Sequence, residues 1–320
     1  MPLKLILVLF SLATSLYAAE HWVRSNEKPL WQRVKTIEMI NGVPTWRPKW
    51  DQTPVIRNTD CLKDTVDDRA DVVLVGDSIF YGVGTDPQQS LAPLLDRLLL
   101  ARLEHHICTV NLAVPGYTFE NERVIGLRDI PVYRPKVVVL EIWANSPHHF
   151  TMLEGEAFNF GSVVVDENGL PNPFGLSPAL HRALFSKSML WRKIIGEQRL
   201  PTHKSLGLWV DLVEDVDEFH EWLVAQDIRL VLAFATKLSV PWGTGRETEA
   251  EHFGLLQAWA AEKGVPTMMF ADILSSMPVE DVRFDSCCHL NNEGTALVAE
   301  GIADVVAPLL AISPPDAPKD

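Results

Sequence analysis

A serine placed where a nucleophile could act is the first notable feature of this 320-residue sequence. Ser78 follows an apolar, strand-like run and comes directly after Gly-Asp. Two later apolar runs end at Gly116 and at Asn145, and His289 stands just before the last helical pattern. Hydrolysis of an acyl group needs parts of these kinds: a hydroxyl nucleophile, a base in contact with it, and N–H donors for the oxyanion.

The Gly-Asp-Ser motif also has a purely structural interpretation. In a tight turn from strand to helix, Gly76 frees the backbone, the Asp77 carboxylate binds turn amides, and Ser78 caps the helix. The motif alone does not separate a nucleophile from a helix cap.

Apolar runs alternate with amphipathic helical patterns from residue 71 onward. The expected strands are 71–77, 108–114, 136–145, 228–235 and 265–272, and the expected helices are 90–106, 121–133 (ending near Pro131), 213–227, 246–264 and 291–311. This alternation predicts a three-layer α/β/α sandwich with a mainly parallel five-stranded sheet. Parallel strands bring their carboxyl ends to one rim, so the candidate residues are expected to converge there.

Four sequence blocks, taken in order, resemble those of the SGNH (GDSL-type) hydrolases, a family with a flavodoxin-like fold. The blocks are "GDSIFYGVG", "NLAVPGYT", "WANS" and "DSCCHLNNEG", and the resemblance covers about residues 70–310. It implies that Ser78 is the nucleophile and His289 the general base. It further implies an oxyanion hole made by the N–H groups of Ser78 and Gly116 and by the Asn145 amide.

Two positions depart from the family pattern. The residue after the block-three asparagine is Ser146, where the family usually has Asp, which we expect to alter loop hydrogen bonding more than catalysis. The family's acid stands three residues before the histidine, whereas here that position is Ser286 and Asp285 lies four before His289. A bulge at Cys287-Cys288 is expected to bring Asp285 onto the imidazole, where an ionised partner fixes the tautomer. The alternative is a backbone carbonyl as partner, which leaves a Ser-His dyad.

Four segments are expected along the chain. Residues 1–19 fit a signal peptide, because the apolar run is too short to span a bilayer comfortably; retention as an anchor is the alternative. Residues 20–70 are expected to form an irregular arm, and 71–312 the hydrolase domain, with an insertion at about 146–212 that could cap the rim. Residues 313–320 are expected to be a disordered tail. The protein is therefore expected to be secreted or periplasmic.

Charge and cysteine content narrow the possibilities further. The net charge is −14 with no basic run, so we expect no nucleic-acid partner. The four cysteines permit two disulfides in three pairings, or none if all four are buried thiols. A bond from Cys287 or Cys288 to Cys61 or Cys108 would hold the bulge beside His289.

No metal or cofactor is predicted. His148 and His149 follow the third strand, but the sequence has no helical His pair of the metalloprotease type, no phosphate-binding loop and no dinucleotide fingerprint. The four sequence blocks lead us to expect an exported serine esterase that acts through a Ser78 acyl-enzyme on a small-molecule, carbohydrate or lipid ester. The alternatives are an O-acyltransferase that uses a sugar hydroxyl and a non-catalytic binding module. Membrane association is expected only if the N-terminal segment is retained.

Overall fold

The computed structural model describes residues 14–23, 25, 34–48, 56–65, 69–147, 150–153, 156–159, 175–196, 202–238 and 246–311. The chain divides into a larger unit of residues 40–43, 50–147 and 206–320 and a smaller unit of residues 1–39, 44–49 and 148–205. All the candidate site residues belong to the larger unit. His148, His149, most of the expected signal peptide and the expected tail lie outside the described residues.

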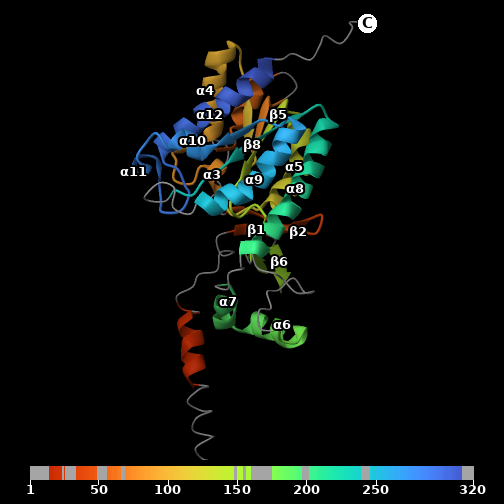
Figure 1. Ribbon diagram of the computed structural model, residues 1–320, viewed down its shortest axis with the longest axis vertical. Helices are drawn as coiled ribbons and strands as arrows, with labels where there is room; N and C mark the ends of the chain where they lie inside the picture. Colours follow the sequence, from red (N-terminus) through yellow and green to blue (C-terminus); the bar gives the residue numbers. More distant parts are fainter. Residues whose placement is uncertain are drawn as a thin grey trace, which may run out of the picture. The chain divides into compact units, whose positions relative to one another are not determined.

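A five-stranded sheet with the strand order β4-β3-β5-β8-β9 forms the centre of the larger unit (Figure 1). The strands are β3 (Val72–Val75), β4 (Thr109–Asn111), β5 (Val137–Ile142), β8 (Arg229–Phe234) and β9 (Thr267–Met269). Every pairing is parallel, which confirms the predicted fold class. All residues of β3 and β5 are buried, as expected for strands covered on both faces.

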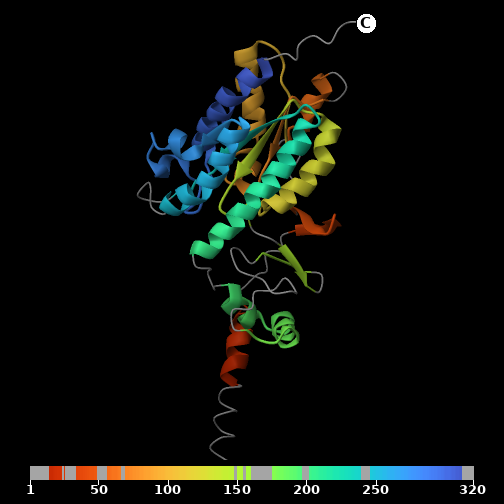
Figure 2. The ribbon, with the colours of Figure 1, turned by 45° about the vertical axis from the view of Figure 1, so that its right-hand side comes forward.

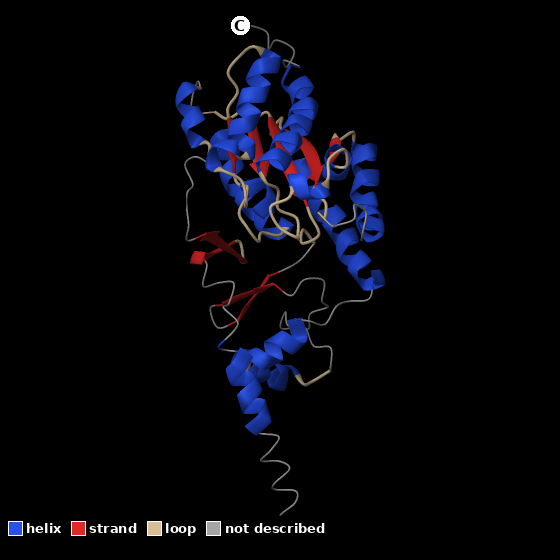
Figure 3. Ribbon diagram, turned by 90° about the vertical axis from the view of Figure 1, so that its left-hand side faces the viewer, coloured by secondary structure: helices blue, strands red, loops and turns tan. Residues whose placement is uncertain are grey.

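Helices α4 (Leu91–Leu103) and α12 (Asn292–Ala311) pack side by side on one face of this sheet, with α10 (Phe270–Leu274) next to α12 (Figure 1). Figure 3 shows helices lying in front of the strands of the sheet. Leucines 91, 95 and 99 of α4 follow one another at helical spacing and are fully buried in the same core as Val298 and Ile302 of α12. Within the described part of the chain, α12 alone is long and apolar enough to cross a membrane, and half of its apolar stretch is buried in the fold.

The opposite face is covered by α5 (Phe119–Tyr133), α8 (Thr202–Val224) and α9 (Arg246–Lys263), with α5 and α8 side by side (Figure 2). The rings of Phe119 and Phe219 meet edge to face with centroids 6.0 Å apart, and Trp259 donates to Asp217 over 2.9 Å. The predicted start of the helix over 213–227 is wrong, because α8 begins at Thr202. Helix α5 ends at Tyr133, the end of the predicted range; Pro131 lies in its last turn, where a proline removes little of the helix.

The strand predicted over 265–272 is also shorter than expected. It ends at Met269, and α10 begins at the next residue. The described part of this unit also contains the short helices η2 (Thr59–Asp64), α3 (Ser78–Tyr81), η4 (Pro87–Gln89) and α11 (Val279–Val282).

The segment predicted to be an irregular arm contains a two-stranded sheet, β1 (Val34–Ile40) and β2 (Val43–Pro48). Asn41 and Gly42 join the strands with positive φ angles of 50° and 87°, as in the tight hairpin turn that Asn-Gly favours. Sequence analysis missed this signal.

The expected insertion contains an antiparallel pair, β6 (Phe150–Leu153) and β7 (Glu156–Asn159), and two helices, α6 (Pro178–Lys187) and α7 (Met189–Gly196). Its place over the rim stays a prediction. Inside the smaller unit the Glu20 carboxylate accepts hydrogen bonds from the N–H groups of Met189 and Leu190, over 2.8 and 3.0 Å. The N-terminal helical segment is thereby attached to the start of α7.

One of the disulfide pairings that the sequence left open is present, and it does not involve the histidine loop. Cys61 and Cys108 form a disulfide, whereas Cys287 and Cys288 are free thiols, one exposed and one buried. The disulfide joins η2 to the chain just before β4, at the amino end of the sheet. Neither Cys287 nor Cys288 is bonded to either of the other cysteines, and the disulfide lies at the opposite end of β4 from Gly116.

We predict that the disulfide stabilises the fold and does not shape the carboxyl rim of the sheet. It closes a loop with a sequence separation of 47, so replacing both Cys61 and Cys108 with Ala should lower the free energy of unfolding by about 2–4 kcal/mol. Urea unfolding followed by circular dichroism measures this, with Cys287→Ala as the control that leaves the midpoint unchanged. Equal midpoints for wild type and the double variant would contradict the prediction.

Candidate active site

The turn that follows β3 presents Ser78 at the carboxyl rim of the sheet. Asp77, not Ser78, is the N-cap of α3: its Oδ1 accepts a hydrogen bond from the N–H of Ile79 over 3.0 Å. Asp77 is buried and Ser78 is partly exposed. The helix-cap interpretation of Ser78 is thus wrong. Its Oγ lies 3.4 Å from Asp77 Oδ1 and has a second, closer partner.

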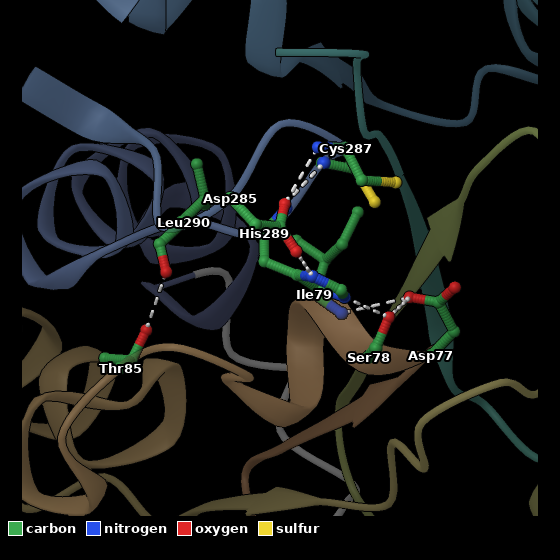
Figure 4. A network of polar contacts seen from close by, with 9 residues as sticks. Asp77, Ser78, Ile79, Thr85, Asp285, Cys287, His289 and Leu290 are labelled. Carbon is green, nitrogen blue, oxygen red and sulfur yellow. Dashed lines mark hydrogen bonds and ion pairs between the residues drawn. The ribbon is translucent and has the colours of Figure 1, made fainter. Parts of the chain in front are cut away.

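That partner is His289, whose Nε2 lies 2.8 Å from Ser78 Oγ (Figure 4). On the other side of the ring, Nδ1 lies 2.5 Å from Asp285 Oδ2. A carboxylate can only accept, so Nδ1 carries the proton and Nε2 is left with a lone pair facing the serine hydroxyl. The contacts form one chain from carboxylate to imidazole to hydroxyl, an arrangement that can remove a proton from Ser78.

The four-residue spacing between Asp285 and His289 is accommodated by a tight loop. Asp285 Oδ1 accepts hydrogen bonds from the N–H groups of Cys287, Cys288 and His289 over 2.9, 3.2 and 3.3 Å. The N–H of Phe284 closes the loop by donating to the His289 carbonyl over 2.8 Å. One oxygen of Asp285 therefore shapes the loop while the other faces the imidazole.

Asp285 is held in its ionised form by these contacts. Partial burial opposes ionisation, but the hydrogen bonds from His289 and from the Cys287 N–H outweigh it, so the pKa of Asp285 is below its usual value. Ser286, at the family's usual acid position, is exposed. The extra residue is taken up in the loop, and the acid still reaches the histidine.

Two backbone N–H groups are available near Ser78. The N–H of Val114 donates to the Gly76 carbonyl over 3.1 Å, so the segment that follows β4 stays paired with the segment that follows β3. Gly116 and Ser78 each lie two residues beyond this pair. Neither N–H donates to an acceptor among the residues that the structure describes. Gly116 has a φ of 84°, a conformation that other residues adopt only with strain.

Asn145 lies close to the nucleophile, but its amide hydrogens are engaged. Its Nδ2 donates to Asp77 Oδ2 over 2.9 Å and to the Tyr117 carbonyl over 2.8 Å. Asn145 therefore ties the nucleophile turn to the Gly116 loop, and it must release one acceptor before it can donate to an oxyanion. Ser146 accepts a hydrogen bond from the Trp143 N–H over 2.9 Å and shapes the turn that carries Asn145.

Sequence analysis missed one residue beneath this site. Glu141, on β5, is buried, and its Oε2 accepts hydrogen bonds from the N–H groups of Asp77 and Phe80. An acidic residue within an otherwise apolar strand was a signal that could have identified it.

No metal centre is found in the described ranges, where no group of three His, Cys, Asp or Glu side chains is arranged to hold an ion.

Comparison with known proteins gives fold-level likenesses only. No family model matches the chain, and no curated protein matches it. Several solved structures are similar. A lipolytic protein of the G-D-S-L family from Desulfitobacterium hafniense is 15% identical, with a TM-score of 0.45 and coverage of 73% of this chain and 98% of that one. A lipase/acylhydrolase from Enterococcus faecalis is 15% identical, with a TM-score of 0.46 and coverage of 78% and 100%. The esterase EstA from a Pseudoalteromonas species is 14% identical, with a TM-score of 0.44 and coverage of 75% and 98%.

The contact between Asp285 and His289 predicts a large effect of Asp285→Asn. The amide oxygen can still accept from the loop N–H groups, but an NH₂ group facing Nδ1 forces the proton onto Nε2. The rate at which a fluorophosphonate labels Ser78 should then fall by several orders of magnitude, since a wrong-tautomer substitution costs about ten-thousandfold in a serine triad.

Ser286→Ala, at the exposed neighbouring position, is the matched control and should label at nearly the wild-type rate. Mass spectrometry of the intact protein over time gives both rates. A full labelling rate in Asp285→Asn would show that a backbone group, not Asp285, orients the imidazole.

Proposed function

We propose that this protein is a serine esterase that forms an acyl-enzyme on Ser78. The observation that carries the proposal is the unbroken contact chain from Asp285 through His289 to the Ser78 hydroxyl, beside two backbone N–H groups without acceptors in the described structure. A nucleophile in contact with an oriented base, together with donors for an oxyanion, is what acyl transfer requires.

In the first half-reaction, Ser78 Oγ bonds to the ester carbonyl carbon while its proton passes to His289 Nε2. The carbonyl oxygen becomes an oxyanion that the N–H groups of Ser78 and Gly116 stabilise. His289 then gives the proton to the departing alcohol oxygen as the carbon–oxygen bond breaks. Asp285 stabilises the transient imidazolium and does not itself accept the proton.

In the second half-reaction, water replaces the alcohol. His289 takes a proton from the water as its oxygen attacks the acyl carbon, and returns it to Ser78 Oγ as the acid leaves. Asn145 contributes by holding Asp77 and the Tyr117 carbonyl in place, and it joins the oxyanion donors if it releases one of these acceptors.

The substrate class we propose is an acyl ester on a carbohydrate or lipid outside the cytoplasm. A disulfide between Cys61 and Cys108 suits an oxidising compartment, and the apolar N-terminal segment suits export. The unusual Asp285 spacing no longer favours a non-catalytic module, because Asp285 contacts His289 despite it.

Ser78→Ala should abolish the hydrolysis of p-nitrophenyl acetate and the covalent labelling by a fluorophosphonate, because among the described residues no other hydroxyl contacts His289. Ser275→Ala, an exposed serine that bonds only to the backbone, is the matched control and should behave as wild type. Labelling that persists at another serine in Ser78→Ala would refute the proposal.

The same acyl-enzyme distinguishes hydrolysis from transfer to a sugar. Wild-type protein incubated with an activated acetyl ester and a candidate sugar acceptor should release acetate as the main product. Acetylated sugar in excess of acetate would identify an O-acyltransferase.

A further inference from the structure

The backbone N–H groups of the nucleophile turn, residues 76–80, are not equivalent. The N–H groups of Asp77 and Phe80 donate to Glu141 Oε2 over 3.1 and 3.0 Å. The N–H of Ile79 donates to Asp77 Oδ1. Of the four N–H groups from Asp77 to Phe80, that of Ser78 alone has no acceptor in the described structure. The Glu141 and Asp77 side chains thus accept three of the four N–H hydrogen bonds, and the N–H of Ser78 is left without an acceptor.

Glu141 reaches the turn from the neighbouring strand through a space that only glycine leaves open. Val75 pairs with Leu140 in the parallel register, so Gly76 comes opposite Glu141. A Cβ atom on residue 76 would overlap the Glu141 carboxyl group and its Cβ. The glycine of the Gly-Asp-Ser motif therefore makes room for a specific side chain beneath the turn.

We propose that Glu141 is a positioning residue: its carboxyl group holds the N–H groups on both sides of Ser78, which aims the Ser78 hydroxyl at His289 and leaves the Ser78 N–H free for the oxyanion. Glu141 does not contact the reacting atoms and acts through the turn.

The surroundings of Glu141 favour its neutral form. Burial, followed by the negative charge of Asp77 and that of Glu122, raises the pKa of Glu141 well above its usual range. Glu122, on α5, is likewise buried, and its pKa is raised by burial and by Asp77. A neutral carboxyl still accepts hydrogen bonds through its carbonyl oxygen, and it places no negative charge beneath a developing oxyanion.

The role predicts different effects for two substitutions at residue 141. Glu141→Gln keeps a neutral carbonyl acceptor of the same length and should retain kcat for p-nitrophenyl acetate. Glu141→Met keeps the volume but removes the acceptor, so kcat and the fluorophosphonate labelling rate should fall about a hundredfold through misplacement of the nucleophile. KM should change much less, because the turn's donors are not substrate contacts.

Glu122→Met is the matched control. It removes a neighbouring buried acid whose side chain makes no hydrogen bond to the turn in the described structure, and kcat should stay near the wild-type value. If Glu141→Met does not fold, Gly76→Ala gives the second route, since its methyl group displaces the carboxyl group while all the catalytic side chains remain.

The inference rests on the proposed function, and the two fail in different ways. Wild-type protein that neither hydrolyses the ester nor labels at Ser78 would defeat the proposed function. Wild-type activity with an unchanged kcat in Glu141→Met would defeat the inference alone. So would a Glu141→Gln variant as impaired as Glu141→Met, because a lost charge and not a lost acceptor would then be responsible.

Discussion

The contact between Ser78 Oγ and His289 Nε2 is the interaction on which the rest of the site depends. It joins the end of β3 to the loop before α12, at opposite ends of the domain's sequence. The parallel sheet makes the contact possible, because the carboxyl ends of its strands share one rim. The packing of α4, which follows the Ser78 turn, against α12, which follows the His289 loop, holds that turn and that loop on the same face of the sheet. Loss of register at either end would separate a base from its hydroxyl by more than a hydrogen-bond length.

Acidic side chains organise this rim, and each is used in a different way. Asp285 is partly exposed, hydrogen-bonded and ionised, so it can fix the histidine tautomer. Glu141 is buried with a raised pKa, so it serves as a neutral acceptor for backbone N–H groups. Asp77 is buried and accepts hydrogen bonds from the Ile79 N–H and from the Asn145 amide. Environment rather than residue type decides which carboxyl group carries charge near the nucleophile.

The fold class could be predicted from the sequence for a physical reason. Strands buried on both faces appear as continuous apolar runs, and the topology of a parallel sheet then fixes where Ser78, Gly116 and Asn145 lie. The cysteine pairing could not be predicted, because four cysteines permit three pairings and the choice depends on three-dimensional distance. The sequence also could not predict which groups the Asn145 amide contacts or that the Glu141 side chain passes beneath Gly76. Both depend on side-chain directions across neighbouring strands. The spacing of Asp285 left either Asp285 or a backbone carbonyl as the partner of the His289 imidazole. In the structure the partner is Asp285.

The tautomer of His289 tests the account most directly. Nitrogen-15 NMR of protein labelled at histidine, with His289 assigned by its loss in His289→Gln, reports which ring nitrogen carries the proton when the imidazole is neutral. The account predicts the Nδ1–H form, in which Asp285 accepts the proton's hydrogen bond and Nε2 is free to accept from Ser78. A neutral His289 protonated on Nε2 would contradict it, because that nitrogen could not take the serine proton.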